Sequence, residues 1–384
     1  MRRPSTFAGK LFFASMIVLL LLQAGFARER GPRVEVVCPF PPLPVQVADH
    51  QVLVYELHIT NFDVVPLTLK RLEISADTDK NPPLKVFSDD SLPGLMFEVG
   101  SKGGSKGSPT IAPGSRAVVF LWIALKSGEK SPRGLRHRMV FVPVVTGDGA
   151  VAIEATLEDF PVPVSDAPVP SLGSPFEGGV WLAGDLSNDS NHRRSLAAID
   201  GHVHLPERFA IDWVKVGPNG DSHDGTARNE NWWGYNEPIH AVADGVVTQV
   251  VDGMPENTPR VLPQKVTLDN IAGNYVIVRI AANRYVTYAH LKTASIKVRT
   301  NERVRRGQVL GLLGNSGNAT GPHLHFQVTD GDSVLQSEGV PFVFDQFTDL
   351  GPGSDYEVNK HASIPRGQSL PANDAVIEFP SMKK

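Results

Sequence analysis

The sequence is nearly free of cysteine. Cys38 is the single cysteine among 384 residues, so no disulfide can form within the chain and the fold must rest on its packed core. Cys38 also lies well past the apolar segment at the N-terminus, which disfavours it as a lipid-modified N-terminal cysteine. We expect it to be a small, buried, apolar residue in a strand.

The sequence also lacks any long run of like charge, and its formal net charge is −4. A protein that binds nucleic acid normally shows a basic patch, so no nucleic-acid partner is expected. Proline (31) and glycine (35) are both abundant, which favours short strands and many turns over long helices. The chain length is typical of two domains, or of three.

The N-terminus has the features of an export signal. Basic residues near the start precede a mostly apolar segment, 11–27, and polar residues follow it. Cleavage after Ala27 would remove a signal peptide of residues 1–27. The alternative is an uncleaved membrane anchor, although the apolar run is short for a span of roughly 20 residues. In both cases the rest of the chain is exported, to the periplasm or cell envelope, with secretion as an open alternative.

Residues 34–165 contain short apolar or alternating stretches that are rich in β-formers and separated by turn signals. The expected strands are 52–59, 67–74, 117–124, 139–145 and 151–157. This spacing predicts an antiparallel β-sandwich of the immunoglobulin-like kind. Its histidines, His50, His58 and His137, are isolated and are expected to be ordinary surface or strand residues.

A proline-rich stretch, 166–178, predicts a semi-rigid linker between two domains. The second domain, 179–347, is again rich in β-formers. Its expected strands are 241–251, 274–280, 284–291, 309–313 and 323–328. The polar tail, 348–384, is expected to be irregular or loosely docked.

Three positions in the second domain are candidates for chemistry. His323 and His325 lie two apart in an expected strand, so both imidazoles can reach one metal, or one can bind while the other handles a proton. Asp212 lies between apolar residues, where an unpaired carboxylate is costly to bury; a metal would explain it, and so would pairing with Arg208 or with a backbone donor. His290 ends a hairpin strand, where an ordinary strand-end histidine is the alternative.

Four stretches carry a family resemblance. They are Val242-Ala243-Asp244-Gly245-Val246-Val247, Gly273-Asn274-Tyr275-Val276-Ile277-Val278 leading to Tyr288-Ala289-His290-Leu291, Arg306-Gly307-Gln308-Val309-Leu310-Gly311 with the turn Gly314-Asn315-Ser316-Gly317, and Gly321-Pro322-His323-Leu324-His325-Phe326. Over residues 200–330 their order resembles the lysostaphin/LytM-type zinc metallopeptidases, which cut peptide stems or cross-bridges in peptidoglycan. The resemblance implies a LytM-type β-sheet domain, similar to a duplicated hybrid motif, that hydrolyses an amide with zinc and without a protein nucleophile.

Carried over residue by residue, the resemblance implies that Asp212 and His325 are zinc ligands. It also implies that His290 and His323 lie beside the reacting water as catalytic groups. One position departs, because the family's first ligand is a histidine four residues before the aspartate and here that residue is Arg208. Arginine stays protonated and offers no lone pair. Catalytic zinc normally has three protein ligands, so either another histidine replaces it or the site is poor in metal.

Five histidines are candidates for the missing ligand: His192, His202, His204, His223 and His240. The principal ones are His192, in a polar stretch that can fold back beside Asp212, and His204, four residues before Arg208. We favour His192, because a loop residue can reach a site from which a strand neighbour points away.

Two functions follow from these observations. One is an exported zinc metalloendopeptidase that acts on peptidoglycan or a similar exported peptide. The other is a metal-poor relative that binds the wall and regulates another hydrolase as its protein partner, which Arg208 would favour. We favour the enzyme, because four of the five expected site residues are present and a binding groove would not need both proton-handling histidines. The sandwich is expected to position the second domain on the wall or on a partner.

Overall fold

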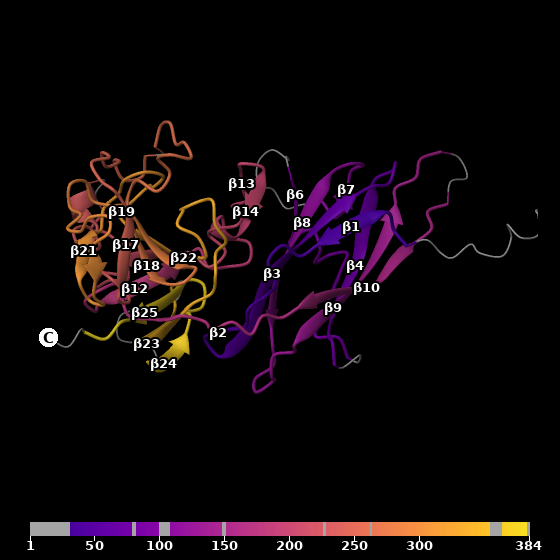
Figure 1. Cartoon of the computed structure of the whole chain (residues 1–384), viewed down its shortest axis with the longest axis horizontal. Helices are drawn as coiled ribbons and strands as arrows, with labels where there is room; N and C mark the ends of the chain where they lie inside the picture. The colour runs from indigo at the N-terminus through magenta and orange to yellow at the C-terminus, as the bar shows by residue number, and fades with distance from the viewer. Residues whose placement is uncertain are drawn as a thin grey trace, which may run out of the picture.

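The computed structural model describes residues 31–78, 82–99, 108–147, 151–225, 228–261, 263–353 and 363–381. Within these ranges the chain is almost entirely β (Figure 1), and its helical elements are two short 3-10 helices, η1 (His192–Arg194) and η2 (Asn229–Asn231). Among the described residues, we find no helix with the length and apolar character needed to cross a membrane. The expected signal peptide, 1–27, lies outside the described residues.

The N-terminal part of the chain forms two antiparallel five-stranded sheets. The first has the order β1-β3-β8-β6 with β2 beside β3, and the second has the order β10-β9-β4-β5 with β7 beside β4. The strands are β1 (Val34–Val37), β2 (Val45–Val47), β3 (His50–Asn61), β4 (Leu67–Ala76), β5 (Lys85–Ser88), β6 (Met96–Glu98), β7 (Thr110–Ile111), β8 (Arg116–Ala124), β9 (Gly134–Pro143) and β10 (Ala155–Pro163). Leu57 of the first sheet and Leu72 and Phe141 of the second belong to one buried core, so the sheets pack face to face.

Two local expectations for this region need correction. The last strand begins at Ala155 and not at Val151, because Val151 and Ile153 are 77% and 75% exposed and make no apolar face. Cys38 lies one residue after β1 and not within a strand. It is partly buried against the core, and burial raises the pKa of its thiol to about 12.

The second part of the chain is built on one 11-stranded sheet (Figure 1), with the order β11-β23-β25-β12-β15-β22-β19-β18-β17-β20 and β24 beside β23. Its strands are β11 (Ser171–Leu172), β12 (Val180–Gly184), β15 (Ile211–Lys215), β17 (Gly245–Val251), β18 (Asn274–Ala281), β19 (Arg284–Leu291), β20 (Arg303–Val304), β22 (Leu324–Thr329), β23 (Val343–Pro352), β24 (Ile364–Ser369) and β25 (Ala375–Glu378). Two small sheets flank it, formed by β13 (Ala197–Ile199) with β14 (His202–His204) and by β16 (Pro238–His240) with β21 (Val309–Leu312). The fully buried Trp181, Trp213 and Phe326 lie in its core.

The segment after residue 347 is part of this sheet, so the expectation of an irregular tail is wrong for its described strands. β25 pairs with β12, and Ile377 and Phe379 enter the core. Strands β12 and β25 are both short, and β12 lies near the start of the domain. No local sequence pattern therefore indicates that they pair. The proline-rich stretch is also partly packed, because Phe176 is buried and its ring stacks on Trp181 with centroids 3.4 Å apart.

The sandwich and the large sheet are in direct contact. Val52 and Val54 of β3 belong to the same buried core as the residues of the large sheet. The amide of Leu370, just after β24, donates to the carbonyl of Gln46 at 2.9 Å, and the amide of Ala48 donates to the carbonyl of Leu370 at 3.0 Å. The backbone after β24 therefore continues the edge of the sandwich at β2.

Candidate metal centre

Strand pairing brings together residues that are distant in sequence. Asp212 of β15 lies opposite His325 of β22, and His325 lies opposite Ala289 of β19, the neighbour of His290. Directly opposed residues in an antiparallel pair share a face of the sheet. His323 lies one residue before β22, and its Nε2 is 3.4 Å from Oδ2 of Asp212.

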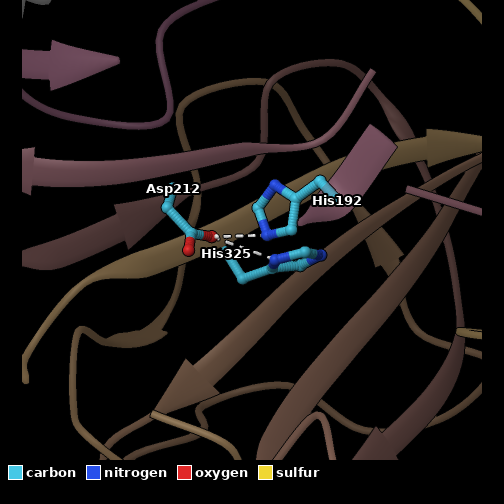
Figure 2. Close-up of side chains that lie close together, drawn as sticks. All are labelled: His192, Asp212 and His325. Carbon is cyan, nitrogen blue, oxygen red and sulfur yellow. Dashed lines mark hydrogen bonds and ion pairs between the residues drawn. The ribbon is translucent and has the colours of Figure 1, made fainter. Parts of the chain in front are cut away.

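A third histidine reaches the same carboxylate from outside the sheet. His192, in η1, places its Nε2 3.5 Å from Oδ1 of Asp212. Its ring meets that of His325 edge to face, with centroids 4.8 Å apart. One ligand atom from each of His192, Asp212 and His325 lies within 4.8 Å of the others, and Figure 2 shows the three side chains pointing toward a common point. Among the candidates for the missing ligand, His192 is thus the one beside Asp212.

The electrostatics around Asp212 favour a cation. Burial alone would raise the pKa of this carboxyl, but the charges of His323 and His192 and the hydrogen bond from His325 outweigh burial and hold it well below its usual range. Oδ1 of Asp212 lies 3.0 Å from Nδ1 of His325. Burial opposes charging of that imidazole, but the hydrogen bond and charge of Asp212 raise its pKa to about 9. Three groups that can each donate a lone pair therefore converge, and a proton or a metal ion between them is needed to offset their repulsion.

His325 is held by a residue that the sequence reasoning missed. Its Nε2–H donates to Oε1 of Gln327 at 2.9 Å, and the amide of Gln327 donates to the carbonyl of Val334 at 2.9 Å. With Nε2–H directed to Gln327, Nδ1 is the nitrogen that faces Asp212, and loss of the Nδ1 proton would free its lone pair for a metal ion. The period of two along β22 could have identified Gln327, because it lies on the same face as His325.

His290 lies beside these groups and stays neutral. Burial and the charges of His323 and His325 lower its pKa well below the usual value. Its Nδ1–H donates to the carbonyl of Ser316 at 2.8 Å, which leaves Nε2 free to accept a proton. The backbone φ of His290 is +61°, in the left-handed region that only a few per cent of non-glycine residues adopt. Its ring centroid lies 4.7 Å from that of His323.

Arg208 does not pair with Asp212. It is 3% exposed, and its guanidinium donates to Glu56 of the sandwich, to Glu338 and to the carbonyl of Gly339. Its Nη2 lies 2.9 Å from Oε2 of Glu56 and 2.7 Å from Oε2 of Glu338. The arginine is thus a buried ion-pair residue, and its charge is directed toward acidic partners.

The remaining candidate histidines have other partners. Nδ1 of His204 lies 3.6 Å from Glu338, and His202 is exposed on the same short hairpin. His223 interacts with Arg260, and Nδ1–H of His240 donates to the carbonyl of Gly307 at 2.8 Å.

A cavity opens onto the three-residue centre, and its volume is about 270 Å³. His192, Asp212, His290 and His325 all line it, together with Asp185 and Glu207. A second cavity of about 340 Å³ shares the lining residues Ile271, Ala272 and Val334 with the first. The two cavities are therefore neighbours.

Residues 233–336 match the model of peptidase family M23. This segment belongs to peptidase family M23. The M23 match contains His290, His323 and His325, whereas Asp212 and His192 precede it. The resemblance noted over residues 200–330 is thereby confirmed for most of its length.

Two curated relatives illustrate the M23 likeness. The chain is 40% identical over 91 residues to the peptidoglycan DD-endopeptidase ShyC of Vibrio cholerae, which is 23% of this chain and 17% of that protein. It is 39% identical over 92 residues to ShyA of the same organism, a peptidoglycan DD-endopeptidase, which is 24% of this chain and 17% of that protein. The alignments thus span less than a fifth of these relatives.

Among solved structures, the catalytic domain of the antimicrobial peptidase lysostaphin from Staphylococcus simulans is similar over 43% of this chain and 88% of that chain. The sequence identity is 17% and the TM-score is 0.24.

Proposed function

We propose that the protein is an exported zinc metalloendopeptidase that hydrolyses peptide bonds in peptidoglycan. The observation that supports this most strongly is the convergence of His192, Asp212 and His325 within 4.8 Å, beside two further histidines. The M23 segment and its similarity to peptidoglycan endopeptidases supply the substrate class. The apolar N-terminal segment, 11–27, supports export.

The donor set suits zinc. Two imidazole nitrogens and one carboxylate oxygen are the ligands of many catalytic zinc sites, which keep a fourth position open. Nε2 of His192, Oδ1 of Asp212 and Nδ1 of His325 would hold the ion, and Gln327 would keep His325 in the required tautomer. When bound there, zinc would supply Lewis-acid activation of water and of a scissile carbonyl.

His290 and His323 are proposed as the proton-handling pair. Nδ1–H of His290 is held by the carbonyl of Ser316, so Nε2 is the nitrogen that can accept a hydrogen bond or a proton from a reacting water. His323 donates Nδ1–H to the carbonyl of Gly321 at 2.8 Å, which fixes its ring with Nε2 toward the carboxylate of Asp212. From this position the ring can donate to an oxygen that gains negative charge during hydrolysis.

The domain limits remain as inferred from the sequence: a sandwich of immunoglobulin-like type over 34–165, a linker over 166–178 and a LytM-type domain, similar to a duplicated hybrid motif, from 179. The pairing of β24 with β23 and of β25 with β12 supports extending the second domain into the C-terminal segment. We further propose that the sandwich helps to present the peptidase to the wall.

The alternative, a metal-poor protein that binds the wall and regulates another hydrolase, depended on Arg208. That arginine is bound to Glu56, and His192 lies beside Asp212, so no observation now favours the alternative.

The test measures zinc content and hydrolysis separately. Purified chain lacking residues 1–27 is loaded with zinc, dialysed and offered cross-linked peptidoglycan, and new amine ends are counted. We expect one zinc per chain and steady release of amines. The His290→Ala variant should keep its zinc and lose about 10²- to 10⁴-fold in rate, the usual share of a proton-transfer group. A wild-type chain that retains no zinc and releases no amines would refute the proposal.

A further inference from the structure

We propose that Glu56 of the N-terminal sandwich is a positioning residue of the metal centre, acting through Arg193 and Arg208. The inference rests on the proposed zinc site and goes beyond it, because it makes the sandwich a structural part of that site. Glu56 lies on β3, and each of its arginine partners belongs to a segment that carries one proposed zinc ligand.

Glu56 is the centre of a buried ionic cluster. Glu56, Arg193 and Arg208 are 2%, 1% and 3% exposed. Nη1 of Arg193 donates to Oε1 of Glu56, while Nε of Arg208 lies 3.1 Å from both carboxylate oxygens. Burial opposes ionisation of Glu56, but the two guanidinium charges outweigh it and lower the pKa to about 2. The carboxylate is therefore charged. It offsets the charge of Arg193 in the interior and, together with Glu338, that of Arg208.

The first arm of the cluster ends at His192. Arg193 follows this histidine directly in η1, and its Nη2 also donates to the carbonyl of Tyr55 at 3.0 Å.

The rest of the segment around η1 is held by the sandwich as well. Nδ2 of Asn188 donates to the carbonyl of Phe120 at 3.0 Å, and Nη2 of Arg194 donates to the carbonyl of Gly94 at 2.7 Å.

The ring of His192 has little other support. Its Nδ1 is buried and has no hydrogen-bond partner in the structure, and its Nε2 faces Asp212. A metal-ligating histidine usually has its second nitrogen fixed by a neighbouring acceptor. Here the position of the ring must come from its backbone, which the sandwich holds.

The second arm of the cluster ends near Asp212. Arg208 lies in the turn that leads into β15, and it ties this turn both to Glu56 and to the carbonyl of Gly339 at 2.7 Å. At the position where the family resemblance implies a zinc ligand, this chain thus has an anchor, a residue that fixes the turn before Asp212 to the sandwich. One carboxylate on the sandwich sets the spacing between the segments of His192 and Asp212.

The experiment compares two ion pairs that join the same two parts of the protein. Glu56→Gln removes the charge at the metal-side cluster with almost no change of shape. Asp49→Asn removes a contact between the sandwich and β24, where Arg366 donates to Asp49. Each variant is made in the chain lacking residues 1–27, and zinc affinity is measured by competition with a chelator. The absorption spectrum of the cobalt(II)-loaded protein reports ligand geometry independently of activity.

We expect Glu56→Gln to weaken zinc binding about 10- to 100-fold and to alter the cobalt(II) spectrum, in the range found when groups supporting a ligand are removed. Asp49→Asn should change the zinc affinity by no more than about twofold and should leave the cobalt(II) spectrum unchanged. If Glu56→Gln does not fold, Arg194→Met decides the matter. It removes the bonds of this guanidinium to the carbonyls of Gly94 and Asn188 and its contact with the ring of Phe120, and it should weaken zinc binding in the same direction.

The outcomes separate the two proposals. The positioning role is overturned if the wild type binds zinc tightly and Glu56→Gln binds it with the same affinity. The same holds for Arg194→Met where that variant decides. Either result leaves the proposed zinc site in place. Equal losses in Glu56→Gln and Asp49→Asn also overturn it, because they would reflect general loosening between the two parts. Absence of zinc from the wild type overturns the proposed function and, with it, this inference.

Discussion

Nε2 of His192 lies 3.5 Å from Oδ1 of Asp212, although the two residues come from a 3-10 helix and from the sheet strand β15. The family resemblance implied a ligand histidine four residues before Asp212, where this chain has Arg208. His192 takes the place of that histidine. A ligand supplied from outside the sheet can be removed without altering the strands, which makes its contribution testable.

We expect His192→Ala to weaken zinc binding by at least about 100-fold, because two protein ligands rarely hold catalytic zinc. Zinc content after dialysis and chelator competition measure the loss. His204→Ala is the matched control, since His204 faces Glu338 and should keep full zinc content. Normal zinc in His192→Ala would show that the ion is bound elsewhere.

Arg208→His should not restore the family's usual ligand arrangement. The side chain at this position points to Glu56 and Glu338, and the substitution leaves a buried carboxylate with one arginine fewer. Loss of one partner from a buried ion pair costs about 3–5 kcal/mol of folding free energy. Urea unfolding of Arg208→His should show this loss, and the double variant with His192→Ala should remain without zinc. Recovery of zinc by the double variant would contradict the assignment of Arg208 as an anchor.

Gln327→Leu should weaken zinc binding about 10- to 100-fold while the sheet stays intact. The substitution removes the acceptor of the His325 Nε2–H bond, so the ring can rotate or change tautomer. The conservative Gln327→Glu should retain zinc, because its carboxylate accepts the same hydrogen bond. Chelator competition on both variants checks this, and equal affinities in wild type and Gln327→Leu would assign Gln327 a packing role only.

The sequence predicted the part of the site that depends on short-range pattern. His323 and His325 share a motif, and Asp212 was noticeable as a carboxylate between apolar residues. The partner of Arg208 was not predictable, because Glu56 belongs to another sheet and its position between Tyr55 and Leu57 does not indicate which cation it pairs with. Strand β25 was missed for the same reason, since its partner β12 is distant in the chain. Long-range pairing and interdomain charge compensation arise only once the chain has folded.

The sandwich should lose stability as the pH falls from about 6.5 toward 4, through His137. This histidine is fully buried, its Nδ1–H donates to the carbonyl of Phe160 at 3.0 Å, and its Nε2 accepts from the hydroxyl of Tyr55 at 2.7 Å. Burial lowers its pKa from 6.5 to about 4. The unfolded chain therefore binds the proton first, so the stabilisation is complete above pH 6.5 and declines as the pH falls.

The size of this effect follows from the displacement of the pKa, which corresponds to about 3 kcal/mol once both states are protonated. The loss of stability is measured by urea unfolding. Hydrogen exchange is followed on peptides of β3 and β9, so that the signal comes from the sandwich alone. His137→Gln can still donate to one partner but cannot take up a proton, so its unfolding midpoint should depend less on pH over the same range. An identical pH dependence in both proteins would assign the acid sensitivity to another group, since no other change separates them.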